Sequence, residues 1–201
     1  MHRRQILLGG GALFLAGCST RWEVGYDSVV DPAVARTWTV SDVIAATPAE
    51  LSVSNANTFA PNADIVWHGE PFGDRREQVA RILGEGVRKG TSGLNGPRRV
   101  TVAATVLEFH AVTPASVSRA PGAVHNVRYA LQVVDSNSGN PLTEQSVINA
   151  DLEAYVGASA VTAAIEGNTQ RVRIVDHIAR VTAGWFGMGP DQRRKFTSIG
   201  R

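Results

Sequence analysis

The chain has 201 residues, of which 43% are hydrophobic and 19% are charged, a composition that suits one globular domain. Lysine and arginine (20) nearly balance aspartate and glutamate (18), so the formal net charge is only +2 and a strongly basic, nucleic-acid-binding surface is not expected. Only one cysteine is present, which excludes an intrachain disulfide. We therefore expect a packed hydrophobic core without covalent cross-links.

The N-terminus has the layout of a bacterial export signal over residues 1–17. Arg3 and Arg4 precede an almost wholly apolar or small run that ends at Gly17, too short to cross a hydrocarbon core that needs roughly 20 helical residues. The run ends in L-A-G-C, which resembles the lipobox of bacterial lipoproteins, in which the cysteine is acylated and the preceding peptide is removed. The resemblance implies cleavage between Gly17 and Cys18 and lipidation of Cys18. A buried cysteine in an N-terminal core helix is the alternative interpretation.

Acylation of Cys18 would determine where the protein resides. Removal of the signal peptide leaves 201 − 17 = 184 residues and takes away two arginines but no acid. The mature chain would then have 18 basic and 18 acidic residues and a formal net charge of zero. Several acyl chains, at about 0.8 kcal/mol per buried CH₂ group, hold a protein to a bilayer. We predict a lipid-anchored protein of the bacterial cell membrane that faces the periplasm, and Ser19 after the cysteine favours the outer over the inner membrane. Arg3 and Arg4 leave both the general and the twin-arginine export routes open.

The segment after the lipobox predicts a tether followed by short strands. Residues 18–35 show no sustained apolar period, which is typical of a flexible lipidated tether between the bilayer and the domain. Residues 36–54 are rich in β-branched side chains and are interrupted by a proline, so two short strands are expected there. The apolar run 64–67 predicts another short, buried strand.

The clearest predicted helix follows this run. Asp74 and Glu77 have the spacing of a capping box, and the next apolar residues recur at helical spacing until Gly90. Gly84 and Gly86 weaken the helix, and we expect them to let it approach the sheet beneath. The opposite, polar face is predicted to carry the arginines (Arg75, Arg76, Arg81 and Arg88).

The second half of the chain predicts three longer strands and a second helix. Alternating apolar residues indicate strands over residues 100–112, 127–133 and 148–156, and the turn-rich D-S-N-S-G-N-P predicts a hairpin between the last two. Helical spacing returns between Thr169 and about Phe186.

Together these elements predict an α+β fold. Their order after the signal peptide is β-α-β-β-β-α, best built as an antiparallel sheet of about four or five strands with two main helices packed on one face. We expect a single periplasm-exposed domain over residues 36–188 and a basic, disordered tail over residues 189–201. The tail is interpreted either as a solvated end or as a contact for anionic phospholipid heads or cell-wall polymer.

Four segments carry a resemblance to a known family. They are A-D-I-V-W-H-G-E-P-F-G-D-R at 63–75, G-T-S-G-L-N-G-P-R-R-V at 90–100, F-H-A-V-T at 109–113 and G-A-V-H-N-V at 122–127. Behind a lipobox, this series resembles an uncharacterised family of alphaproteobacterial lipoproteins, over about Trp38 to Trp185. The resemblance implies no activity, because the family has no assigned reaction. In architecture alone, the chain also resembles the auxiliary lipoproteins of envelope lipid-transport systems.

No complete catalytic motif is present in the sequence. His68-Gly69-Glu70 has the H-x-E spacing of zinc deaminases, but the P-C-x-x-C that completes their metal site is missing. The chain contains no H-E-x-x-H, and G-T-S-G at 90–93 is not the G-x-S-x-G elbow of hydrolases. We therefore expect a protein that is not an enzyme and assign it no cofactor.

Histidines offer one candidate metal site. His110 lies near the end of one predicted strand and His125 near the start of the next, so the two would come close if these strands pair, and His68 would join them. Three imidazoles, or two with Glu70 or Asp74, would bind zinc at about 2.0–2.2 Å. The favoured interpretation is that these histidines bond to loop backbone and hold no metal.

The remaining surface candidates are aromatic. Trp67 and the following loop with Phe72 form a candidate partner-binding site, and core packing is the competing interpretation of the tryptophan. Three functions are then open, of which the first is favoured: a non-catalytic accessory domain that binds an unidentified envelope protein, a lipid- or small-ligand-binding lipoprotein, and a metal-dependent hydrolase. The second requires a continuous apolar cavity between the sheet and the helices. The third requires His68, His110 and His125 to converge.

Overall fold

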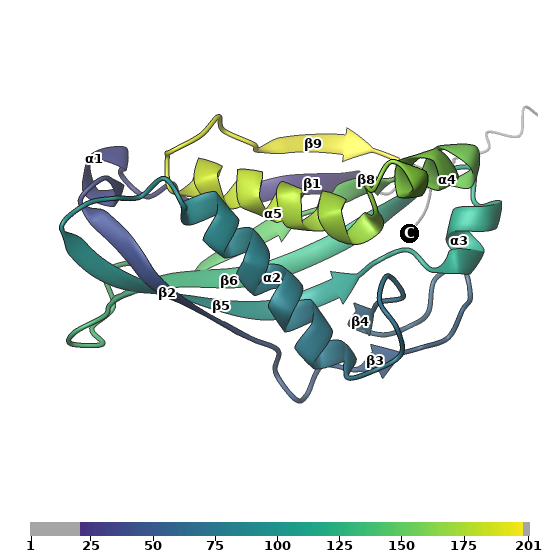
Figure 1. Cartoon of the computed structure of the whole chain (residues 1–201), viewed down its shortest axis with the longest axis horizontal. Helices are drawn as coiled ribbons and strands as arrows, with labels where there is room; N and C mark the ends of the chain where they lie inside the picture. The colour runs from purple at the N-terminus through teal and green to yellow at the C-terminus, as the bar shows by residue number, and fades with distance from the viewer. Residues whose placement is uncertain (1–20, 199–201) are drawn as a thin grey trace, which may run out of the picture.

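The computed structural model describes residues 21–198 and shows one mixed β-sheet with helices packed against it (Figure 1). Helices α2 and α5 cover one face of the sheet, and α3 and α4 lie at one end of it. Within the described residues there are nine strands and five helices. The strands are β1 (Arg21–Tyr26), β2 (Trp38–Ala46), β3 (Val53–Ser54), β4 (Ile65–Val66), β5 (Arg98–His110), β6 (Ala123–Asp135), β7 (Ser146–Ala150), β8 (Leu152–Ala154) and β9 (Arg194–Thr197). The helices are α1 (Pro32–Ala35), α2 (Arg75–Thr91), α3 (Pro114–Arg119), α4 (Gly157–Ile165) and α5 (Gln170–Trp185).

The predicted small antiparallel sheet is wrong in both size and direction. The strand order is β3-β4-β5-β6-β7-β1-β9, with β2 also paired to β5 and β8 to β6. Strands β2 and β4 run parallel to β5, and β3 runs parallel to β4. The crossover through α2 explains the parallel pairing of β4 with β5, because a helix between two strands returns the chain to the same end of the sheet. Side-chain alternation indicates that a strand exists but not which way its partner runs.

The central antiparallel part of the sheet matches the prediction. Strands β5 and β6 pair from Val100↔Asp135 to His110↔Asn126. Strands β6 and β7 form the expected hairpin, with Tyr129 opposite Ile148. Strand β6 is buried over most of its length, and β5 alternates between buried and half-buried residues after its first two, as strands with neighbours on both sides are expected to do.

The chain ends of the described region are part of the sheet, which corrects two expectations. The predicted tether over 18–35 contains strand β1, whose Trp22 is buried opposite Phe196 of β9. The predicted disordered tail over 189–201 contains β9, and the segment before it is fixed by a hydrogen bond that the Tyr26 hydroxyl donates to Asp191 Oδ1 at 3.0 Å. The alternation in R-W-E-V-G-Y is short, and both of its partner strands lie far away in the chain.

Helix α2 begins where the sequence predicts it to begin. The Asp74 carboxylate accepts hydrogen bonds from the backbone amides of Arg76 at 2.9 Å and Glu77 at 3.2 Å, which satisfies two free donors of the first turn. Its apolar face is fully buried against the sheet and α5 (Val79, Ile82, Leu83 and Val87). Within residues 21–198, no helix has the length and apolar character needed to cross a bilayer.

Two glycines of α2 allow close packing, but on different neighbours. A Cβ at Gly84 would lie 3.2 Å from the Ala45 Cβ of β2, so this glycine faces the sheet as expected. A Cβ at Gly86 would lie only 2.5 Å from Ile178 Cγ2, so the second glycine instead lets α5 approach. At this position α2 and α5 are therefore in close contact.

Candidate partner-binding site

The two aromatic residues of the predicted partner site lie in the loop between β4 and α2, but only one of them is exposed. Trp67 has no exposed surface and packs edge-on against Phe109, with ring centroids 5.7 Å apart. Phe72, five residues later, is 83% exposed. Trp67 is therefore a core residue, and Phe72 alone is available to a partner.

A buried arginine holds this loop from the inside. Arg75, only 6% exposed, donates from Nη1 to the backbone carbonyls of Glu70 and Pro71, each at 3.2 Å. The same nitrogen donates to Gln78 Oε1 at 2.7 Å, and Nε donates to Asn55 Oδ1 at 2.9 Å. Hydrogen bonds from a charged donor are stronger than neutral ones, so the loop backbone has a defined shape. The expectation that Arg75 lies on the exposed face of the helix is wrong, because at the first turn it points into the loop.

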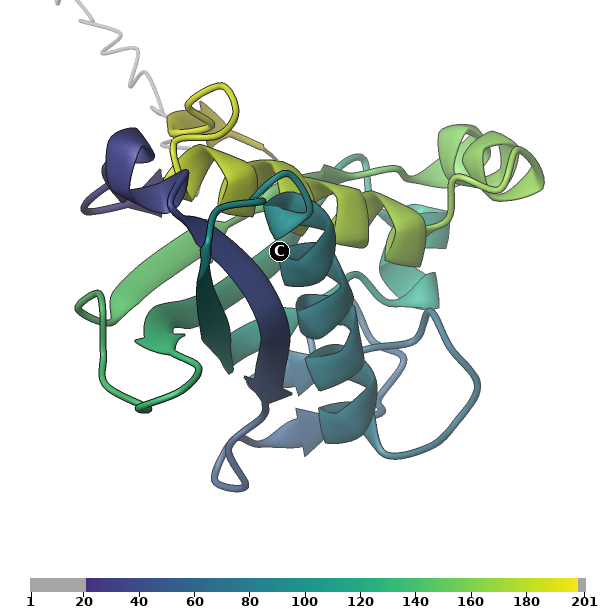
Figure 2. The same ribbon diagram turned by 60° about the vertical axis from the view of Figure 1, so that its left-hand side comes forward.

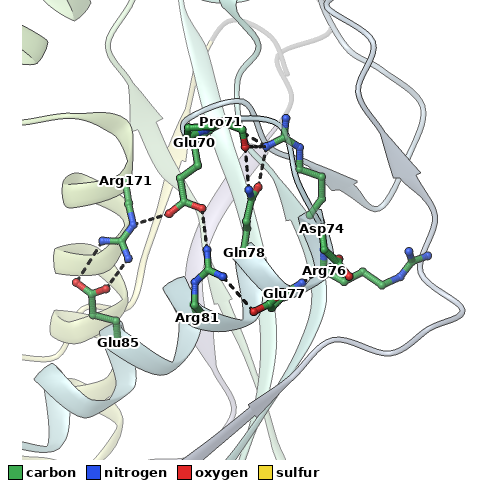
Figure 3. A network of polar contacts seen from close by, with 10 residues as sticks. Glu70, Pro71, Asp74, Arg76, Glu77, Gln78, Arg81, Glu85 and Arg171 are labelled. Carbon is green, nitrogen blue, oxygen red and sulfur yellow. Dashed lines mark hydrogen bonds and ion pairs between the residues drawn. The ribbon is translucent and has the colours of Figure 1, made fainter.

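Ion pairs fix the same loop to both helices (Figure 3). The Glu70 carboxylate accepts from Arg171 Nε of α5 at 2.9 Å and from Arg81 Nη2 of α2 at 3.4 Å. Arg171 also donates to Glu85 Oε2 at 2.6 Å, and this bond is the main cause that raises the pKa of Arg171. The Arg81 and Glu85 ends of the network are about half exposed, and ion pairs reached by solvent contribute roughly 0–1 kcal/mol each, so the network positions the loop more than it stabilises the fold.

Gly69, near the start of the loop, is required because the chain passes very close to the Trp67 ring at this position. A Cβ at Gly69 would lie 2.3 Å from Trp67 Cη2, because the chain folds back over the indole ring. No side chain fits at this distance without displacing the tryptophan from the core. The motif H-G-E-P-F-G-D-R is thus a folded unit that presents Phe72 outward.

A surface groove of about 320 Å³ lies beside this loop. Its walls are formed by Gly69, by α3, by α4 and by the first turn of α5. The Arg173 guanidinium stacks 3.5 Å from the centroid of the Tyr155 ring at its rim. Gln170 Oε1 is buried and has no hydrogen-bond donor within residues 21–198. Apolar and small side chains make up most of the lining (Val117, Ala160, Val161, Ala163 and Ala164).

The predicted histidine set is not assembled. Within residues 21–198, no group of three or more His, Cys, Asp and Glu side chains is placed to hold a metal ion. His110 is 3% exposed opposite Asn126 in the sheet, His125 is fully buried, and His68 is half-buried in the loop before Gly69. Burial, followed by the nearby positive charge of Arg75, lowers the pKa of His68.

His125 has a different neighbour, His177 of α5, which the sequence analysis missed. Burial lowers the pKa of His125 to about 3, with smaller contributions from Arg173 and His177. Burial likewise lowers the pKa of His177 to about 4, helped by the positive charges of Arg180, Arg194 and Arg173. Both imidazoles are therefore neutral at physiological pH. The position of His177 on the apolar stripe of α5, between Ile174 and Val181, is the signal that identifies it as a core residue.

The predicted cleavage and lipidation residues, Gly17 and Cys18, lie outside the described residues. The nearest described element is β1, which begins at Arg21. Their assignment therefore rests on the sequence alone.

Comparisons with known proteins identify a family. No curated protein matches the chain. Among solved structures, a PelC dodecamer from Paraburkholderia phytofirmans is 12% identical with a TM-score of 0.36, covering 82% of this chain and 96% of that one. A point variant of that protein is 15% identical with a TM-score of 0.34, covering 78% and 95%. A candidate lipoprotein from Caulobacter crescentus CB15 is 14% identical with a TM-score of 0.32, covering 54% and 83%. The model of a family described as a family of unknown function (DUF6778) matches residues 38–201, and the chain therefore belongs to this family.

Proposed function

We propose that the protein is a lipid-anchored component of the bacterial cell envelope that acts by binding another envelope protein, without chemistry of its own. The lipobox at Cys18 supports the anchor, and Ser19 favours the outer membrane. The observation that carries the binding role is Phe72, which is 83% exposed on a loop that is fixed by the buried Arg75.

An exposed aromatic side chain on a defined loop suits a binding anchor. Hot spots of protein interfaces are rich in aromatic residues, which supply a large contact area with few rotatable bonds. A loop that already has its bound shape loses less conformational entropy when the partner binds. The Arg75 guanidinium also lies 5.6 Å from the centroid of the Phe72 ring, which restricts the orientation of the ring.

A second candidate function is supported by the groove beside the loop. Its volume of about 320 Å³ is within the range of small-ligand sites, and its lining is mostly apolar with the unpaired Gln170 Oε1 as a polar group. A lipid chain or another small apolar ligand would bind there. The space between the sheet and the two main helices is filled, so the groove replaces the internal cavity that this function was expected to need.

Crosslinking in native membranes tests the binding role. In the tagged full-length protein, Phe72→Ala is expected to reduce recovery of a specific crosslinked partner by at least about tenfold, as truncation of a hot spot does. Ile44→Ala is the matched control, because Ile44 is 58% exposed on β2 and lies away from the loop. Cys18→Ala provides the unanchored reference.

Two outcomes would contradict this proposal. Equal recovery of the partner with Phe72→Ala and Ile44→Ala would remove the loop from the interface. Recovery of phospholipid and of no protein above the background would favour the groove as a ligand site.

A further inference from the structure

We propose that the end of the domain that carries α3 and α4 rests directly on the lipid bilayer that holds the anchor. This inference rests on the proposed acylation of Cys18 and specifies which surface the acyl chains bring to the membrane. The apolar side chains of Tyr155, Val161 and Ile165 form the contact.

The distance between the anchor and the folded domain is short. Only two residues, Ser19 and Thr20, lie between Cys18 and Arg21, where β1 begins, so Arg21 is three positions after the cysteine. A chain spans at most about 3.6 Å per residue, so Arg21 is within about 11 Å of the acylated cysteine. Because β1 is a strand of the sheet, no long tether holds the domain away from the membrane.

Strand directions show which surface is brought to the membrane. Strand β1 pairs antiparallel with β7, placing Val24 opposite Ala150, so β1 begins at the end of the sheet where β7 leads into β8 and α4. The amide of Glu23 donates to Asp151 Oδ2 at 3.0 Å, which fixes this alignment. Strand β5 ends and β6 begins at the same end, with α3 between them. The start of β1, α3 and α4 therefore share one end of the molecule, where α3 and α4 lie in Figure 1.

This end exposes apolar side chains, of which Tyr155 and Val161 also line the groove. Val161 and Ile165 are one helical turn apart on α4 and are 60% and 82% exposed, and Tyr155 before the helix is 42% exposed. Helix α4 contains no charged residue between Gly157 and Ile165. Figure 2 shows that α4 projects from the sheet, so one side of it packs on α3 and the other is free to meet a flat surface.

The charges at this end fit the headgroup region rather than a strongly electrostatic contact. Arg21 and Arg119 are exposed there, but so are Glu153 and Glu166, so the signs are mixed. The contact is therefore chiefly apolar, like that of an interfacial helix whose apolar face enters the headgroup boundary by about 5–10 Å. Tyr155, stacked on Arg173, has the amphipathic character that interfaces favour.

Site-specific quenching tests this inference in the full-length, acylated protein. Because Cys18 is the single cysteine and its sulfur would be acylated, an introduced cysteine is the only free thiol. Ile165→Cys, Val161→Cys and the control Ile44→Cys would each be labelled with an environment-sensitive fluorophore. The proteins are reconstituted in vesicles of phosphatidylethanolamine and phosphatidylglycerol that contain nitroxide-bearing lipid.

The expected result is that labels at 165 and 161 are quenched at least about threefold more than the label at 44, as immersion by about 5–10 Å requires. Flotation of the protein with equal quenching at all three positions would overturn the membrane contact and leave the anchor intact. Failure to float would overturn the anchor and this inference together. If the label at position 165 is protected from solvent in native membranes but not in vesicles that contain no other protein, this face binds a protein partner. That result would overturn the inference.

Discussion

Between pH 7 and pH 5, the free energy of unfolding is expected to fall by about 4 kcal/mol, or about 2 kcal/mol for each of two buried histidines. His125 and His177 have their pKa values lowered in the folded protein to about 3 and about 4. In the unfolded chain both pKa values return to about 6.5, so as the pH falls the unfolded chain binds protons before the folded protein does. Their stabilising effect is complete above that value and is lost as the pH falls from it toward the folded pKa values.

The contributions of carboxyl groups to the free energy of unfolding change mainly outside the range from pH 7 to pH 5. The pKa of Asp135 is lowered to about 2, first by a backbone hydrogen bond from Ser138, so its effect appears below pH 4. Burial raises the pKa of Asp151, and because a raised carboxyl pKa favours folding at lower pH, Asp151 partly offsets the loss of stability from the histidines near pH 5.

Urea unfolding at pH 7, 6 and 5 measures the total change in the free energy of unfolding. His177→Gln, which cannot titrate, should reduce it by about half. A stability that does not change over this range would show that the folded protein accepts protons on both rings.

Replacing Gly86 by alanine is expected to destabilise the protein by about 2 kcal/mol, although alanine is the better helix former. The added Cβ would lie 2.5 Å from Ile178 Cγ2, 2.7 Å from Ile178 Cβ and 3.2 Å from the Val175 carbonyl oxygen. Relief of this clash requires α5 to move away from α2, and with it the buried side chains that α5 holds against the sheet. The measurement is the free energy of unfolding in urea at pH 7.

Gly93→Ala provides the matched control for this substitution. A Cβ at Gly93 meets nothing within 4 Å, so its effect should stay within about 0.5 kcal/mol of zero. Equal stabilities of the two variants would show that α5 shifts at almost no cost and that the close helix contact is not required.

Local signals in the sequence predicted the elements that depend on them. The capping residue Asp74, the apolar stripe of α2 and the hairpin of β6 and β7 are all encoded within a few neighbouring residues. Strand direction is not, so the parallel pairing of β2 and β4 with β5 was missed. The sequence of β1 predicts a tether for a similar reason, because its six residues gain their partners only from the distant β7 and β9.

The candidate site was predicted in part. The segment 63–75 was identified, but its sequence does not reveal that Trp67 points into the core while Phe72 points outward. The burial of Arg75 depends on the backbone carbonyls of a folded loop, which residue type alone does not indicate. The groove is formed by three parts of the chain that are far apart, Gly69, Val117 and the stretch 155–173, so no pattern in any one of them predicts it.

The pairing of β1 with β7 and β9 also determines the order in which the sheet is completed during synthesis. The chain is synthesised from its N-terminus, so Val24 and Tyr26 stay without their strand partners until the segment around Ile148 has emerged, and Trp22 until β9 has emerged. Contacts between such distant segments carry a large loop-closure entropy and form slowly. Strand β9 then covers the last hydrogen-bonding edge of β1. During this interval β1 is an unpaired strand, a state in which pairing with another chain can lead to aggregation.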